Sequence, residues 1–215
     1  MNHQDIDRIV KRYEDEKGFS HELLRLVKEL PTLMDLATTK WGDREPNIEF
    51  DLFFVAHNEI FTDCACTPIQ IRLGPLFSLE SNYGVAKHFL TQELMQVIAP
   101  PADGISWTNL DKGISTIFSE RYSGFIFPKN DSLPSYYYAC ELFKKFEALA
   151  GESAIRDLRN KRKSKGELSR FSNISALEIQ AEYPKVTEAI AKDLTNKWDR
   201  QNHLAAFPNL NDWYV

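Results

Sequence analysis

Residues 88–98 read His-Phe-Leu-Thr-Gln-Glu-Leu-Met-Gln-Val-Ile, and residues 107–124 read Trp-Thr-Asn-Leu-Asp-Lys-Gly-Ile-Ser-Thr-Ile-Phe-Ser-Glu-Arg-Tyr-Ser-Gly. Both stretches mix apolar and polar residues as amphipathic helices do. A Pro-Pro loop and an Asp-Gly turn lie between them. We therefore expect one helix over about 85–98 and a second over about 109–121, with Asn109 as its cap.

Polar side chains in these two stretches have the order of a known metal site. Gln92 and Gln96 are four residues apart and share a helix face, with Glu93 beside them. The stretches resemble those of gluzincins, zinc peptidases in which a His-Glu-x-x-His helix is followed by a helix that supplies a carboxylate ligand. The resemblance covers roughly residues 48–165. It implies that Gln92, Gln96 and Lys112 stand at the ligand positions, and that Glu93 keeps the general-base position.

These substitutions argue against zinc chemistry. A neutral amide oxygen is a poor zinc ligand compared with imidazole or carboxylate. A protonated lysine has no lone pair to give a metal. We therefore expect no bound metal and no cofactor. Our hypothesis is that the ammonium of Lys112 stands in for the metal and pairs with Glu93, which would otherwise be a costly buried charge.

The fold implied by the resemblance is α+β and zincin-like, with a small, mostly antiparallel sheet packed by many helices. Apolar and alternating patterns predict strands near 48–57 and 68–73, and residues 60–66 could be a loop or a short strand. We divide the chain into an N-terminal helical segment, residues 1–45, and a zincin-like domain with C-terminal helices, residues 46–215.

Composition limits the class of protein. The chain has 215 residues, of which 43% are hydrophobic and 27% charged, enough for a sizeable core in one domain. A net charge of −5 argues against nucleic acid as an overall partner. We see no signal peptide and no apolar run of transmembrane length, and three cysteines are typical of a reduced protein. We therefore expect a cytoplasmic protein with no membrane contact.

Four further features are candidates for chemistry. His88 lies one turn before Gln92 and could form a displaced metal site, although a lone helical histidine is more often an ordinary core residue. Cys64 and Cys66 form a Cys-x-Cys that lacks the second pair a zinc site usually needs. Tyr122 could hydrogen-bond into the cleft or simply pack its ring. The basic segment 156–170 could dock an acidic partner or RNA, or could be a solvated helix end.

Three functions remain open from the sequence. The first, which we favour, is a catalytically inactive peptidase-like domain that binds a peptide or protein or serves as a scaffold. The second is a metal-independent or relocated-site hydrolase that uses Glu93 as its base. The third is a binder of nucleic acid or an acidic partner through the segment 156–170. The plainest alternative to the resemblance is that both stretches are merely amphipathic core helices.

Overall fold

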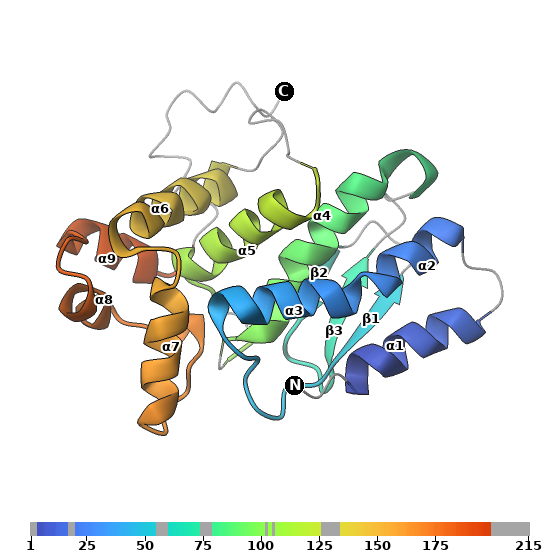
Figure 1. Ribbon diagram of the computed structural model, residues 1–215, viewed down its shortest axis with the longest axis horizontal. Helices are drawn as coiled ribbons and strands as arrows, with labels where there is room; N and C mark the ends of the chain where they lie inside the picture. Colours follow the sequence, from blue (N-terminus) through green and yellow to red (C-terminus); the bar gives the residue numbers. More distant parts are fainter. Residues whose placement is uncertain are drawn as a thin grey trace.

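The computed structural model describes residues 4–16, 20–54, 60–73, 79–101, 103–104, 106–125 and 134–198. The elements are α1 (Gln4–Asp15), α2 (His21–Lys28), α3 (Leu30–Trp41), β1 (Phe50–Phe54), β2 (Ile60–Asp63), β3 (Ile69–Leu73), α4 (Leu79–Ile98), α5 (Asn109–Tyr122), α6 (Pro134–Ala150), α7 (Ala154–Ser164), the 3-10 turn η1 (Phe171–Asn173), α8 (Ala176–Glu182) and α9 (Glu188–Thr195). The α+β class is confirmed (Figure 1). None of the described helices is long and apolar enough to cross a membrane.

The sheet is mixed, so the expectation of a mostly antiparallel sheet is wrong. Its order is β1-β3-β2. The central strand β3 pairs antiparallel with β2 and parallel with β1. The reason is topological: β3 follows β2 in the chain and returns between β2 and β1, so it runs in the direction of β1. The strand at 60–63, left open by the sequence, therefore forms an edge of the sheet.

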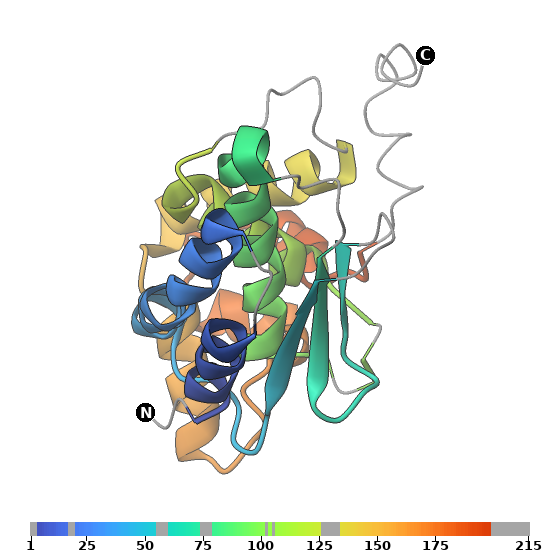
Figure 2. The same cartoon turned by 90° about the vertical axis from the view of Figure 1, so that its right-hand side faces the viewer.

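One face of the sheet carries the apolar side chains. Ile69, Ile71 and Leu73 of β3 are buried, and the residues between them are half-buried, as the alternating sequence predicts. Helices α1 and α4 pack against the sheet, and Figure 2 shows the strands as a layer at one side of the helices. The sheet thus brings β2 against α4, the helix with the glutamine pair.

Helix α5 begins with a capping box. The N-cap is Thr108 rather than the expected Asn109, because the Thr108 hydroxyl accepts from the Asp111 amide and the Asp111 carboxylate accepts from the Thr108 amide. Gly113 lets α5 approach α6: a Cβ there would lie 2.6 Å from the Ala139 carbonyl oxygen. The glycine after Lys112 is therefore a packing requirement, and it fixes how deeply Lys112 lies between the helices.

The N-terminal helices share the core of the remaining chain. The ring of Trp41 at the end of α3 lies 5.3 Å from the ring of Phe118 on α5, edge to face. Arg159 of α7 is fully buried and donates to the backbone carbonyls of Trp41, Gly42 and Asp43. Near the C-terminal end of the described residues the chain forms two helices, α8 and α9, which are separated around Pro184.

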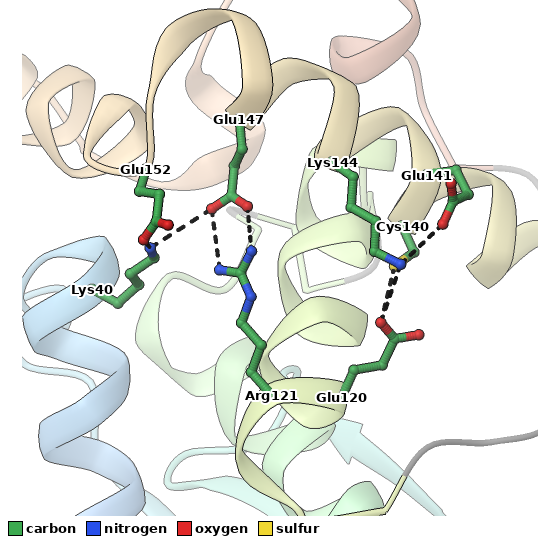
Figure 3. A network of polar contacts seen from close by, with 8 residues as sticks. All are labelled: Lys40, Glu120, Arg121, Cys140, Glu141, Lys144, Glu147 and Glu152. Atoms are coloured by element: carbon green, nitrogen blue, oxygen red, sulfur yellow. Dashed lines mark hydrogen bonds and ion pairs between the residues drawn. The ribbon is translucent and has the colours of Figure 1, made fainter.

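A cluster of charged side chains joins α3, α5 and α6 (Figure 3). Glu147 of α6 is buried and accepts from Arg121 of α5 at 2.6 and 3.3 Å, and Lys40 of α3 lies 3.9 Å away. Lys144 pairs with Glu120 at 3.3 Å. These contacts hold the C-terminal half of α5 against α6.

Candidate functional site

The glutamine pair and Glu93 are buried on α4, where Glu93 contacts β2 and Gln96 contacts α5. Gln92, Glu93 and Gln96 are each no more than 7% exposed. The Glu93 carboxylate accepts from the Thr62 hydroxyl of β2 at 2.7 Å and from the Gln96 amide at 2.6 Å. Both bonds use the same carboxylate oxygen, and together they fix the Glu93 side chain between the sheet and its own helix.

Lys112 reaches this group from α5 through Gln96. Its Nζ donates to Oε1 of Gln96 at 3.4 Å, a long hydrogen bond. Gln96 therefore accepts from Lys112 with its oxygen and donates to Glu93 with its nitrogen. Within the part of the chain that the structure describes, Lys112 makes no direct ion pair with Glu93, so the expected direct pairing is wrong. The two side chains are instead connected through the Gln96 amide.

Burial governs the protonation of both ionisable groups. It raises the pKa of Glu93, and the nearby positive charge of Lys112 opposes that rise. It lowers the pKa of Lys112, and the charges of Glu93 and then Asp111 oppose that fall. Each charge therefore favours the charged form of the other, and losing one would drive the other toward neutrality.

Three aromatic rings surround the Lys112 ammonium. Nζ lies 4.6 Å from the ring centre of Trp107, 5.2 Å from that of Trp198 and 5.7 Å from that of Tyr136. These distances are within the range of cation–π attraction. The rings come from the loop before α5, from the segment after α9 and from the start of α6. We call Trp107, Tyr136 and Trp198 the aromatic cage.

The donor set does not fit the zinc ion that the resemblance implies. Two neutral amides and an ammonium occupy the positions that the resemblance assigns to the ligands, and the ammonium donates to the amide oxygen of Gln96. Across the described ranges no three His, Cys, Asp or Glu side chains are arranged to hold a metal.

His88 lies on the same helix but turns to different partners. Its Nε2 lies 3.3 Å from the hydroxyl of Ser119, and its Nδ1 lies 3.2 Å from the carbonyl oxygen of Phe125. Burial lowers the pKa of His88. The histidine thus joins α4 to α5. Ser119 is fully buried, so this serine and histidine are not presented to a substrate.

Tyr122 is not brought to the Glu93 group. It follows Lys112 by ten positions on α5, which corresponds to roughly 15 Å along a helix axis. Its ring packs on Phe118 with centres 4.9 Å apart. The interpretation of Tyr122 as a packing residue fits this position better than a role in the cleft.

The Cys-x-Cys follows β2 directly. The Cys66 thiol donates to the Asp63 carboxylate at 3.2 Å, which raises the Cys66 pKa. Burial, reinforced by the charge of Glu93, raises the pKa of Cys64 to about 12. Neither thiol is thus poised as a thiolate, the form that attacks substrates or binds metals. His57, another residue near the strand end, lies outside the described residues.

The basic segment 156–170 is largely engaged within the fold. Arg159 binds backbone carbonyls, and Arg162 pairs with Glu178 at 2.5 Å and Glu167 at 3.3 Å. Lys161 pairs with Glu182. These contacts support the interpretation of the segment as a structural helix end more than as a nucleic-acid surface.

Sequence reasoning did not select Thr62, Tyr136 or Trp198 as residues of the site. Thr62 carried a weak signal, since it lies in a stretch that could be a strand before the glutamine helix. Tyr136 is one of three consecutive tyrosines, and no pattern marks it out. Nothing local connects Trp198 to Lys112, because their proximity depends on how α9 returns to α5.

Comparison with protein-family models, with curated proteins and with solved structures finds no match to this chain.

Proposed function

We propose that this chain is a zincin-like domain without metal-dependent peptidase chemistry, and that it acts by binding a peptide or protein or as a scaffold for one. The observation that carries the proposal is the placement of Lys112. A cation supplied by the chain itself donates to the oxygen of the Gln96 amide, and the nitrogen of the same amide donates to Glu93.

The burial and the hydrogen bonds of Glu93 support a binding function over catalysis. The side chain is 6% exposed, and the same carboxylate oxygen accepts two hydrogen bonds. A general base must lie within reach of a substrate proton or a water molecule. A buried carboxylate held by Thr62 and Gln96 favours a structural role, so the metal-independent hydrolase is the weaker alternative.

The sheet supports a peptide as the class of partner. Strand β2 pairs only with β3 among the described strands, and it lies at the edge next to α4. Extended peptides bind such edges by adding a strand, with main-chain hydrogen bonds supplying affinity. The proposed partner is therefore an extended segment of another protein.

The test combines metal content, turnover and binding on one preparation of the full chain. The protein is incubated with zinc, dialysed and analysed for metal, then incubated with a mixed peptide library in solution. The same library is passed over immobilised protein. We expect far less than one zinc per chain, no cleavage and retention of a subset of peptides.

Stoichiometric zinc, or cleavage that is lost in the Glu93→Gln variant, would overturn the proposal in favour of an enzyme. Absence of any retained peptide would remove the peptide-binding part and leave the scaffold role.

A further inference from the structure

A short extended segment after α9 lies along the chain just before α5. Lys197 forms an antiparallel bridge with Thr108. The Asn109 amide donates to the Asn196 carbonyl oxygen at 3.1 Å, and the Trp198 amide donates to the Trp107 carbonyl oxygen at 2.7 Å. We call residues 196–198 the strap. Its contacts to 107–109 are those of a peptide added as a strand.

The strap also delivers a side chain to the Lys112 site. The Trp198 ring lies 5.2 Å from Nζ of Lys112 and 5.1 Å from the ring centre of Tyr136. Without Trp198 the ammonium would lose one of the three rings of the aromatic cage. The buried indole Nε1 of Trp198 has no hydrogen-bond partner among the described residues. The ring is therefore held by packing and by the cation, with its own donor unused.

We propose that residues 107–109, together with Lys112, Tyr136 and Trp107, form a recognition site for an extended peptide that carries an aromatic side chain, and that the strap occupies this site from within the same chain. The backbone of 107–109 binds the main chain of the peptide. The Lys112 ammonium and the Tyr136 ring bind the aromatic side chain. The strap is thus an autoinhibitory contact.

The chemistry of the site selects this partner class. Main-chain pairing with 107–109 requires only an extended backbone, and two such bonds are modest in strength. Discrimination comes from the ring over Lys112, since a cation attracts an aromatic face and tryptophan and tyrosine are among the side chains enriched at interface hot spots. An acidic side chain in place of the tryptophan would be attracted by Lys112, but it would also be repelled by the buried carboxyl groups of Glu93 and Asp111.

This inference goes beyond the proposed function, because its site is the segment 107–109 rather than the edge of β2, and it rests on the peptide-binding proposal only for the identity of an external partner. Occupancy of the site by the strap can be tested without that partner, because the strap itself is a usable probe. Failure of the strap test would leave the library experiment unaffected, and the reverse also holds.

The experiment uses the full chain and a fluorescent hexapeptide with the sequence of residues 193–198, Asp-Leu-Thr-Asn-Lys-Trp, with blocked ends. Binding is measured by fluorescence anisotropy. We expect Trp198→Ala to bind the peptide at least tenfold more tightly than the unaltered chain, because the site is then vacant. Replacing the tryptophan of the peptide with alanine should abolish the gain, and so should adding Lys112→Met.

Equal affinity for the unaltered chain and Trp198→Ala, or a gain that does not depend on the tryptophan of the peptide, would overturn the proposal. Trp198→Leu serves as a second variant that keeps an apolar side chain, and thermal unfolding of each variant checks that it is folded.

A measurement on the unaltered protein covers the case in which no variant folds. The amides of Asn109 and Trp198 close the strap, and both should exchange with solvent at least tenfold faster than the amide of Phe118 within α5. Exchange of the two strap amides as slow as that of Phe118 would mean that the strap opens only on global unfolding, which contradicts a displaceable segment.

Discussion

Nζ of Lys112 on α5 donates to Oε1 of Gln96 on α4, so a lysine and a glutamine join the two helices at the point that the proposed resemblance assigns to a metal. The other end of the same amide donates to Glu93. A peptidase would use this carboxylate as a base. Here it lies in the middle of a chain of hydrogen bonds that runs from Thr62 in the sheet to Lys112 on α5.

Replacing Gln96 should destabilise the fold more than replacing Gln92. Gln96→Met removes the bridge and leaves Glu93 and Lys112 buried without it, which should cost about 2 to 4 kcal/mol. Gln92→Met is the matched control, since Gln92 is equally buried and makes no hydrogen bond to another described residue. Denaturant unfolding measures both, and equal losses would refute the bridge.

Glu93 and Lys112 should behave as a coupled pair. Lys112→Met and Glu93→Gln each leave the partner charge uncompensated, whereas the double variant removes both charges. We expect the double variant to be more stable than the sum of the single losses indicates, by about 1 to 3 kcal/mol. Purely additive losses in denaturant unfolding would show that the two charges do not interact.

Asp111 should make stability depend on pH in a defined window. Burial raises its pKa from the ordinary 3.8 to about 6. An acid with a raised pKa in the folded state favours folding below pH 4, and this contribution is lost as the pH rises through 6. Asp111→Asn does not titrate, so the unaltered protein should lose up to roughly 3 kcal/mol relative to it between pH 4 and pH 7.

The pH comparison is made by denaturant unfolding of both proteins at each pH. Parallel pH profiles for the two would contradict a raised pKa. A general loss of stability in Asp111→Asn at every pH reports the capping box instead, because Asp111 accepts from the Thr108 amide.

Glu147 should matter more than Glu152, although both carboxylates lie near Lys40 (Figure 3). Glu147 is 8% exposed at its side chain and also binds Arg121, whereas the Glu152 side chain is 77% exposed. Glu147→Gln should cost about 1 to 2 kcal/mol, since Arg121 remains partly solvated. Glu152→Gln should leave the melting temperature unchanged. Equal shifts for the two variants would contradict the larger contribution of the buried Glu147.

The parts of the structure that depend on local sequence pattern could be predicted. The parts that depend on how distant segments of the chain pack together could not. The alternation of Ile69, Ile71 and Leu73 predicts β3, and the i, i+4 spacing of Gln92 and Gln96 predicts their shared face. The parallel pairing of β1 with β3 has no local signal, because it follows from where the third strand inserts. The position of Trp198 over Lys112 likewise depends on α9 packing against α5 and α6.

The absence of a direct Glu93–Lys112 ion pair also depends on packing that the sequence pattern does not show. Because Glu93 and Lys112 carry opposite charges, we expected an ion pair. The sequence alone does not give the distance between α4 and α5, so it could not show whether the Lys112 side chain reaches Glu93. Gly113 and the aromatic cage position Lys112 so that its ammonium reaches the amide of Gln96 rather than the carboxylate of Glu93.

Restoring the ligands tests the central claim that α4 and α5 form a zincin-like frame with a cation in place of the metal. The triple variant Gln92→His, Gln96→His, Lys112→Glu recreates two imidazoles four residues apart and a carboxylate on the facing helix. The double variant Gln92→His, Gln96→His, which keeps Lys112, is the matched control. We expect one zinc per chain by metal analysis after dialysis in the triple variant, and none in the control or the unaltered protein. A folded triple variant that binds no zinc would contradict the account.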